Sequence, residues 1–281
     1  MRIIRSLKEM SGFSRKVHLK RKTIGFVPTM GALHDGHLSL IRKARQENAK
    51  VVVSIFVNPI QFGPQEDYKR YPRNLKRDAL LCQKEGTDVI FYPDIRQMYP
   101  HNYKTYVTVQ DLSRALCGKF RPGHFQGVAT VVAKLFNIVS PDSAYFGQKD
   151  AQQAIIIQKM VRDLNMPIKI KVMPTVREKN GLAMSSRNTY LKENERRDAS
   201  GLYQALNLAR NLIKHGKRDS LEIIRKMKRL INSQKSASVQ YISIVDLKDL
   251  KAVTKIKGKV LIALAVFIGK TRLIDNIVVK V

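Results

Sequence analysis

The stretch IGFVPTMGALHDGHLSLIRKAR, residues 24–45, decides the fold of this 281-residue chain. An apolar run ends at Pro28, a glycine-containing turn follows, and apolar residues then recur at helical spacing. This order of strand, glycine loop and helix places a helix amino terminus where it can bind an anion. His34 and His37 are three residues apart at the start of that helix and share one face. Either histidine alone could be a helix cap or a surface residue, but the pair suits the phosphates of a nucleotide.

The chain is strongly basic along its whole length. It has 52 Lys and Arg against 22 Asp and Glu, a formal net charge of +30. Residues 1–175 carry 29 basic and 13 acidic side chains, and residues 176–281 carry 23 and 9. Because the excess is spread out, with no RNP-like or zinc-finger pattern, we expect a generally basic surface and no specific nucleic-acid partner. A basic nucleic-acid-binding protein remains an alternative, and it would bind with a steep salt dependence.

Cysteine usage and hydropathy bear on the compartment. Cys82 and Cys117 match no metal-ligand spacing, and two cysteines fit a reducing compartment better than a disulfide scaffold. The start, MRIIRSLKEM, has no apolar segment of signal-peptide length. The longest apolar run, residues 260–268, is too short to cross a bilayer. We therefore expect a cytoplasmic protein with no membrane partner and no metal site built from its own side chains.

Strands and helices alternate through the first part of the chain. The strands are expected at residues 23–28, 50–57, 88–92, 143–146 and 168–173. The helices are expected at residues 36–48, 72–86, 128–139 and after 150. Less regular pieces are a short N-terminal element in residues 1–22, a strand near 105–109 and a small helix near 111–115. The alternation predicts an α/β fold, a Rossmann-like doubly wound parallel sheet.

The character of the sequence changes after the last of these strands. Two basic amphipathic helices are expected, followed by three strands with a tight hairpin turn at Gly269-Lys270. The expected ranges are 192–215 and 219–234 for the helices, and 239–246, 259–268 and 271–279 for the strands. We therefore divide the chain into a Rossmann-like domain, residues 1–175, and a smaller C-terminal α+β domain, residues 176–281, which covers the cleft.

Four polar turns follow predicted strands, and parallel strands bring their carboxyl ends to one edge of a sheet. The donors on these turns are His34, His37, Gln61, Lys149, Gln153, Ser185, Ser186 and Arg187. Carboxylates are scarce among them, and there is no Walker A motif, dinucleotide fingerprint or Gly-x-Ser-x-Gly nucleophile. Such a pocket suits the stabilisation of phosphate charge by positioning and electrostatics.

Two of these turns, HDGH and MSSR, resemble the nucleotide signatures of the class I aminoacyl-tRNA synthetase and nucleotidyltransferase superfamily. The fuller resemblance is to the pantothenate synthetase (pantoate–β-alanine ligase) family. It is carried, in chain order, by VPTMGALHDGHLSLI, FVNPIQFGPQEDYKRYPRNL, FRPGHFQGVATVVAKLFNIV, YFGQKDAQQ, GLAMSSRNTYL and GKTRLIDN. These blocks span nearly the whole chain.

The resemblance implies an enzyme of vitamin B5 and coenzyme A biosynthesis. It would join (R)-pantoate to β-alanine with ATP, through a pantoyl-adenylate, and release AMP and pyrophosphate. It also implies Mg²⁺ bound with the nucleotide, and a homodimer.

The resemblance assigns roles to matching positions. The catalytic residues would be His34, His37, Lys149 and Arg187. Pantoate would be bound by Gln61 and Gln153, and β-alanine by Gln61. The ATP site would comprise Met30, Gly31, Ala32, Leu33, His34, Asp35, Gly36, His37, Gly147, Gln148, Lys149, Asp150, Val176, Met184, Ser185, Ser186 and Arg187. Gln148 stands where some relatives have an acidic residue.

One further alternative is another adenylyl- or nucleotidyl-transferring enzyme of the superfamily, sharing only HDGH and MSSR. The contexts of Gln61 and Gln153 oppose it, because the family uses these amides to bind the acid and not the nucleotide.

Overall fold

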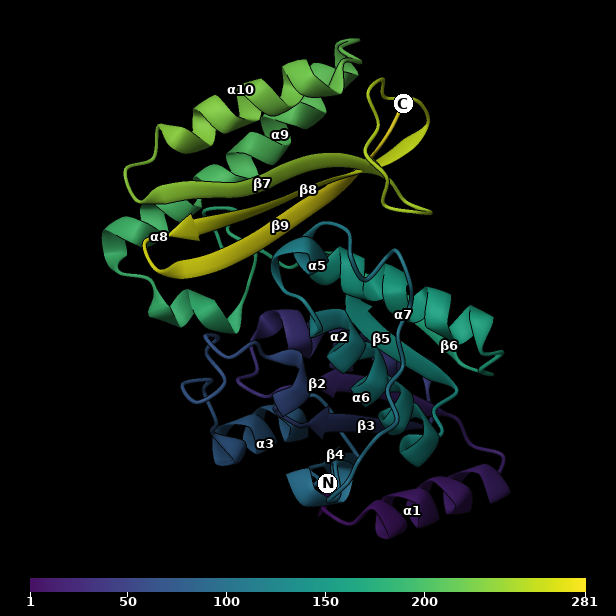
Figure 1. Cartoon of the computed structure of the whole chain (residues 1–281). Helices are drawn as coiled ribbons and strands as arrows, with labels where there is room; N and C mark the ends of the chain where they lie inside the picture. Colours follow the sequence, from purple (N-terminus) through teal and green to yellow (C-terminus); the bar gives the residue numbers. More distant parts are fainter.

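The computed structural model describes residues 1–281 and contains two β-sheets (Figure 1). The larger sheet has six strands in the order β1-β4-β3-β2-β5-β6, all parallel. Its strands are β1 (Arg2–Ile4), β2 (Ile24–Thr29), β3 (Lys50–Ile55), β4 (Val89–Phe91), β5 (Ser143–Gly147) and β6 (Lys169–Met173). The chain moves outward from β2 in one direction and from β5 in the other. A crevice therefore opens between the carboxyl ends of β2 and β5, the topological switch point of the sheet.

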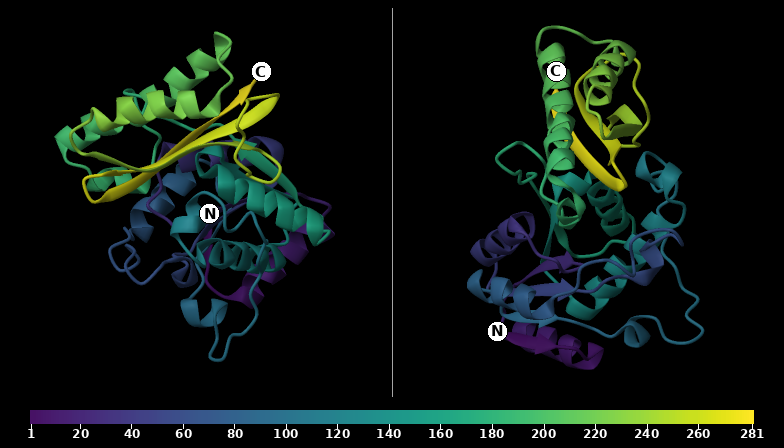
Figure 2. Two further views of the ribbon diagram at one scale, coloured as in Figure 1. Left: turned by 45° about the horizontal axis from the view of Figure 1, so that its top comes forward. Right: turned by 90° about the vertical axis from the view of Figure 1, so that its left-hand side faces the viewer.

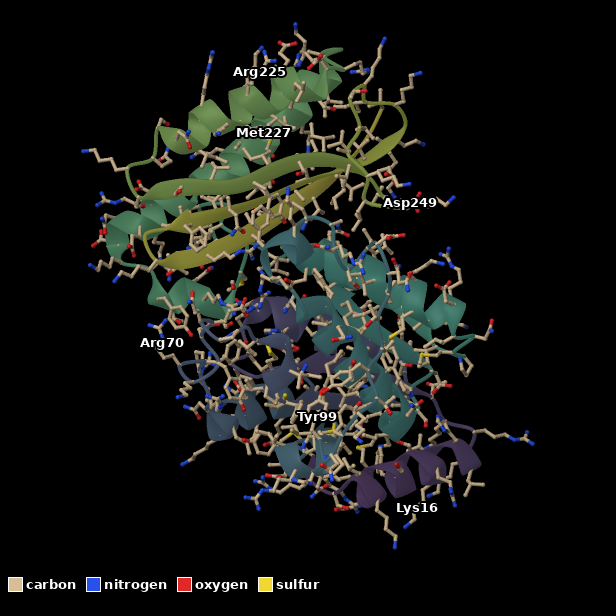
Figure 3. The ribbon with its side chains drawn as sticks, viewed as in Figure 1. Lys16, Arg70, Tyr99, Arg225, Met227 and Asp249 are labelled. Carbon is tan, nitrogen blue, oxygen red and sulfur yellow. The ribbon has the colours of Figure 1, made fainter.

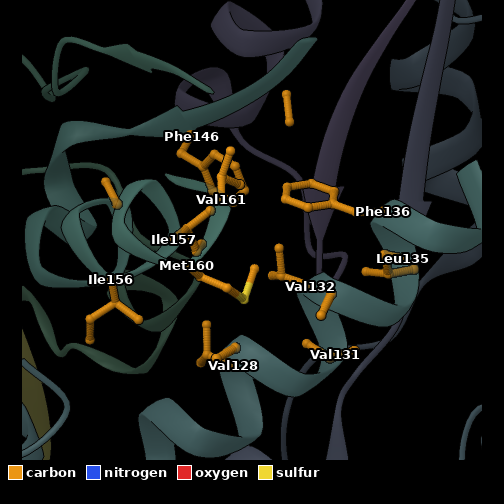
Figure 4. Close-up of a cluster of buried hydrophobic side chains, with 14 of the residues drawn as sticks. Val128, Val131, Val132, Leu135, Phe136, Phe146, Ile156, Ile157, Met160 and Val161 are labelled. Carbon is orange, nitrogen blue, oxygen red and sulfur yellow. The ribbon is translucent and has the colours of Figure 1, made fainter. Parts of the chain in front are cut away.

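Helices cover both faces of this sheet. They are α1 (Leu7–Leu19), α2 (Asp35–Glu47), α3 (Leu75–Lys84), α4 (Ile95–Met98), α5 (Cys117–Phe120), α6 (His124–Val139) and α7 (Ala151–Asp163). Alternate strand residues supply the two cores: Phe26 and Val52 pack with α1, α6 and α7, whereas Val27 and Val53 pack with α2 and α3. Figure 4 shows the first of these cores where α6, α7 and β5 meet. This double burial explains the continuous apolar runs of the strands.

The smaller sheet is antiparallel, in the order β7-β8-β9. Its elements are α8 (Glu193–Ala199), α9 (Gly201–Lys214), α10 (Ser220–Asn232), β7 (Ala237–Asp246), β8 (Lys259–Ile268) and β9 (Thr271–Lys280). Alternate residues of β8 face α9 and α10, while Leu261 and Ala263 join the core of the larger sheet. The sheet thus lies between α9 and α10 on one side and α5 and α7 on the other (Figures 1 and 2).

Most of the expected elements are present, with shifted ends. The predicted helix at 72–86 begins only at Leu75, because Asn74 caps it by accepting a hydrogen bond from the Arg77 amide. The predicted helix at 128–139 begins earlier, at His124, after Gly123 in a left-handed conformation. The first 22 residues contain both an edge strand, β1, and a full helix, α1.

Three expectations are wrong. Residues 105–109 form no strand because no other strand lies beside them, and Val107 donates to the Thr130 hydroxyl instead (2.9 Å). Residues 111–115 form turns, and the short helix α5 follows them. The single helix expected at 192–215 is divided into α8 and α9 at Ser200, whose amide donates to the Arg197 carbonyl in a tightened turn.

The basic side chains lie over both parts of the molecule. Figure 3 shows Lys16 on α1 and Arg225 on α10 extending from opposite ends. None of the helices has the combined length and apolar character that crossing a membrane requires.

Candidate active site

A cleft of about 220 Å³ opens at the carboxyl ends of β2 and β5, at the switch point. Its walls come from the turns after β2, β3 and β5 and from residues 174–187. Fourteen of the predicted site residues line it: Met30, His34, Gly36, His37, Gln61, Gly147, Lys149, Asp150, Gln153, Val176, Met184, Ser185, Ser186 and Arg187. Segments far apart in the sequence therefore meet at one place because parallel strands end at one edge.

Five predicted ATP-site residues do not line this cleft: Gly31, Ala32, Leu33, Asp35 and Gln148. The amides of Ala32 and Leu33 donate to the buried carboxylate of Asp78 (2.8 and 3.0 Å), which holds the turn after β2 from behind. Asp35 is exposed at the start of α2. The amide of Gln148 points away from the cleft and donates to the Asn276 Oδ1 atom of β9 (3.0 Å).

The HDGH turn brings its two histidines together at the start of α2. His34 is the N-cap, and its Nδ1 accepts a hydrogen bond from the Gly36 amide (3.2 Å). A Cβ at position 36 would lie 2.9 Å from the His34 ring, so a larger residue there would displace this ring. The His34 and His37 ring centroids are 4.1 Å apart. The Nδ1 atom of His37 is buried and has no hydrogen-bond partner in the protein, while the residue itself lines the cleft.

Both imidazoles are neutral at pH 7. Burial, followed by the nearby Lys149 ammonium, lowers the pKa of His34 to about 4. Burial also lowers the pKa of His37 well below its usual value, with His34 and Lys149 adding to the effect. The histidines therefore supply uncharged hydrogen-bonding groups. The positive charge of the cleft comes from Lys149, Arg121 and Arg187.

A second group of side chains surrounds Gln61 at the end of η1 (Pro59–Gln61). Its Oε1 accepts from the Asn58 Nδ2 (3.0 Å), and its Nε2 donates to the Met30 sulfur (3.1 Å). Asn58 also donates to the Gly127 carbonyl (3.0 Å) and accepts from the Tyr99 hydroxyl (2.8 Å). Neighbouring apolar side chains on the cleft wall are Val128, Val131 and Val132. This part of the cleft combines amide and apolar groups.

His124 fixes the backbone of Gln61, a role that sequence reasoning missed although the block containing His124 was recognised. Its Nδ1 lies 2.8 Å from the Gln61 carbonyl oxygen, and its Nε2 lies 2.9 Å from the Arg121 guanidinium. Because a guanidinium only donates, Nε2 accepts and Nδ1–H donates to the carbonyl. Burial and then Arg121 lower the pKa of His124 to about 4, consistent with this neutral form. Arg121 is held in turn by Glu66, with a distance of 2.6 Å from Nε to Oε1.

Two acidic residues of the loop after η1 pair with the cleft arginines. Glu66 pairs with Arg121, and Asp67 accepts two hydrogen bonds from Arg187 (2.9 and 2.7 Å). In the same loop, Tyr71 lies within hydrogen-bond distance of the Ser186 hydroxyl (3.1 Å). Sequence reasoning missed these partners because nothing local indicates which arginine each carboxylate meets.

Fold and site together define a class: α/β proteins that bind a phosphorylated ligand at the switch point of a parallel sheet. A family model described as Pantoate-beta-alanine ligase matches residues 2–278, and the chain belongs to this family. It is 56% identical over 281 residues to a pantothenate synthetase from Caldicellulosiruptor saccharolyticus, with 100% of each chain covered.

Solved structures agree with this assignment. Pantothenate synthetase from Thermus thermophilus superposes with a TM-score of 0.93 at 44% identity, covering 99% of each chain. A pantoate-beta-alanine ligase from Francisella tularensis, complexed with beta-gamma ATP and beta-alanine, has a TM-score of 0.83 at 38% identity. It covers 99% of this chain and 97% of its own.

Gly127 provides a test of how α6 positions Gln61. A Cβ there would lie 2.5 Å from the Ile60 carbonyl oxygen and 2.8 Å from the Gln61 Cα. Since both atoms are backbone, G127A must displace η1, and we expect a loss of about 1–3 kcal/mol in the free energy of unfolding. The matched control is G12A in α1, where a Cβ meets nothing within 4 Å. Urea denaturation of both variants measures the effect, and a G127A midpoint equal to that of the wild type would contradict the packing account.

Proposed function

We propose that this chain catalyses the ATP-dependent condensation of (R)-pantoate with β-alanine to pantothenate, through a pantoyl-adenylate. Family membership supports the reaction, and the Francisella tularensis relative holds an ATP analogue and β-alanine. One observation carries the assignment of residues. One cleft brings the groups suited to phosphate, His34, His37 and Lys149, together with the amides of Gln61 and Gln153.

In the first step the pantoate carboxylate attacks the α-phosphorus of ATP. A new O–P bond forms, the bond to the bridging oxygen of pyrophosphate breaks, and pyrophosphate leaves with its electron pair. Negative charge accumulates on the α-phosphate oxygens, and Lys149 is the cleft cation beside both histidines that offsets it. We assign His37 to support this role as an uncharged hydrogen-bonding group, because it lines the cleft beside Lys149. His34 and the residues Met184 to Arg187 complete the nucleotide side.

Pantoate has one carboxylate, two hydroxyls and two methyl groups. We assign the hydroxyls to the amides of Gln61 and Gln153, which bind them without adding charge. The methyl groups then contact the apolar wall formed by Val128, Val131 and Val132. This arrangement directs the carboxylate toward Lys149 and the α-phosphate.

In the second step the β-alanine amine attacks the carbonyl carbon of the adenylate. A C–N bond forms, the C–O bond to AMP breaks, and the amine proton is lost to solvent. We place β-alanine beside Gln61, whose backbone is fixed by His124.

Arg187 can contact a phosphate while it stays paired with Asp67. Its Nε and Nη2 donate to that carboxylate, and its Nη1 makes no hydrogen bond within the chain and is left for an ATP phosphate.

Mg²⁺ belongs to the same proposal, as an ion carried on the ATP phosphates. No group of three or more His, Cys, Asp or Glu side chains is arranged to hold a metal ion. Mg²⁺ commonly needs only one or two protein carboxylates besides phosphate oxygens and water. Asp150 on the cleft wall is the carboxylate that fits. When bound, the ion would neutralise phosphate charge.

The domain division and the compartment are also part of the proposal. Residues 1–175 and 176–281 are assigned as two domains, the smaller covering the cleft. Both cysteines are free and buried, which supports a cytoplasmic location.

Exchange of labelled pyrophosphate into ATP tests the function. With pantoate present and β-alanine absent, the wild-type protein should incorporate label, because adenylation is reversible. Omitting pantoate should abolish incorporation. Exchange with another acid but not with pantoate would overturn the substrate, and no exchange with any acid would overturn the function.

We also propose a homodimer, paired through residues 104–108. This segment is extended and largely exposed, and the backbone groups of residues 104–106 form no hydrogen bonds within the chain. Such an unpaired edge is a template for another strand. Light scattering should give twice the 32.1 kDa chain mass, and T105P, which removes one backbone donor, should shift the protein toward monomer. A wild-type monomer at micromolar concentration would contradict the proposal.

A further inference from the structure

The GKTRLIDN block, residues 269–276, is recognised in the sequence, yet it supplies no residue to the reaction proposed above. Its last two residues, Asp275 and Asn276, lie in β9 and are 3% and 4% exposed. Polar residues buried this completely in a strand need hydrogen-bond partners. Their partners lie in the two segments that carry Lys149 and Arg187.

Asn276 binds the turn after β5. Its Nδ2 donates to the carbonyl oxygens of Gln148 (2.9 Å) and Lys149 (2.8 Å), and its Oδ1 accepts from the Gln148 Nε2 (3.0 Å). Both amide hydrogens are thus used on the backbone of the turn. An aspartate could not replace it, because a carboxylate has no hydrogen to donate to two carbonyl oxygens.

The turn itself has little else to hold it. Neither η2 (Gln148–Asp150) nor α7 begins with a side-chain cap. Gly147, the last residue of β5, is paired with Met173, but a Cβ on it would meet nothing within 4 Å, so no side chain packs against the start of the turn there. The direction in which Lys149 leaves the backbone therefore depends on the contact with β9.

Asp275 holds the second segment from the opposite face of β9. Its carboxylate accepts two hydrogen bonds from Arg177 (2.6 and 3.0 Å), and the Arg177 guanidinium lies 3.8 Å from the centre of the Tyr203 ring. Arg177 also donates to the Gly181 carbonyl (3.1 Å), closing the loop that leads to Arg187. One dipeptide of the C-terminal sheet thus fixes both nucleotide-side segments.

We propose that Asn276 is a positioning residue for Lys149, acting from β9 through the backbone of the turn. Asp275 likewise positions the loop before Arg187, through its hydrogen bonds with Arg177. The inference rests on the role proposed above for Lys149. It assigns the C-terminal domain a part in adenylation beyond covering the cleft.

The test measures pantoate-dependent pyrophosphate exchange in the full-length protein. In N276A we expect kcat to fall about 10- to 100-fold, as for a reacting group misplaced by roughly 1 Å, with KM for pantoate nearly unchanged. N276D keeps the side-chain volume and the bond from Gln148 but loses both donated bonds, and it should show the same loss. The control I277V alters the adjacent buried residue of β9 without touching the turn, and it should keep wild-type kcat.

A double variant separates positioning from a merely structural role. If Asn276 acts through Lys149, N276A should reduce kcat in the wild type but not further in K149A. Wild-type kcat in folded N276A and N276D, or an equal loss in the K149A background, would overturn the inference while the proposed function stands. Wild-type exchange in K149A, or none in the wild-type protein, would instead overturn the proposed role of Lys149 and this inference with it.

Discussion

The structure depends on one topological constraint, the reversal of strand order between β2 and β5. Where neighbouring strands continue in opposite directions, their connections leave a crevice at the carboxyl edge. The starts of α2 and α7 both open onto this crevice, so that helix termini, His34 and Lys149 converge without any long loop. Other contacts hold the walls of this crevice in position, among them those of His124 with Gln61 and of Asn276 with the turn after β5.

Charge in the crevice is arranged by burial and pairing. His34 and His37 are neutral because they are buried beside Lys149. Of these three side chains, only Lys149 carries a positive charge. Arg121 and Arg187 are compensated by carboxylates of one loop. The net charge of +30 does not contribute to this local balance, since its side chains are spread over both ends of the molecule.

The sequence predicts the parts of this design that are local. Alternation of strands and helices indicates the doubly wound sheet, and HDGH and MSSR indicate the nucleotide side. Residues 105–109 show the limit: their composition favours a strand, but a strand exists only where another lies beside it. His124 and Asn276 show another limit, because each acts on a backbone distant in sequence, at Gln61 and at residues 148–149. Such contacts leave no periodic signal in a single sequence.

The proposed reaction begins with attack of the pantoate carboxylate on the α-phosphorus of ATP. The most direct test uses pantoate labelled with ¹⁸O in its carboxylate, with ATP and β-alanine, and mass spectrometry of the products. We expect one labelled oxygen in AMP and none in pyrophosphate, because the bridging oxygen of the adenylate comes from pantoate. Unlabelled AMP, or label in phosphate or pyrophosphate, would contradict it.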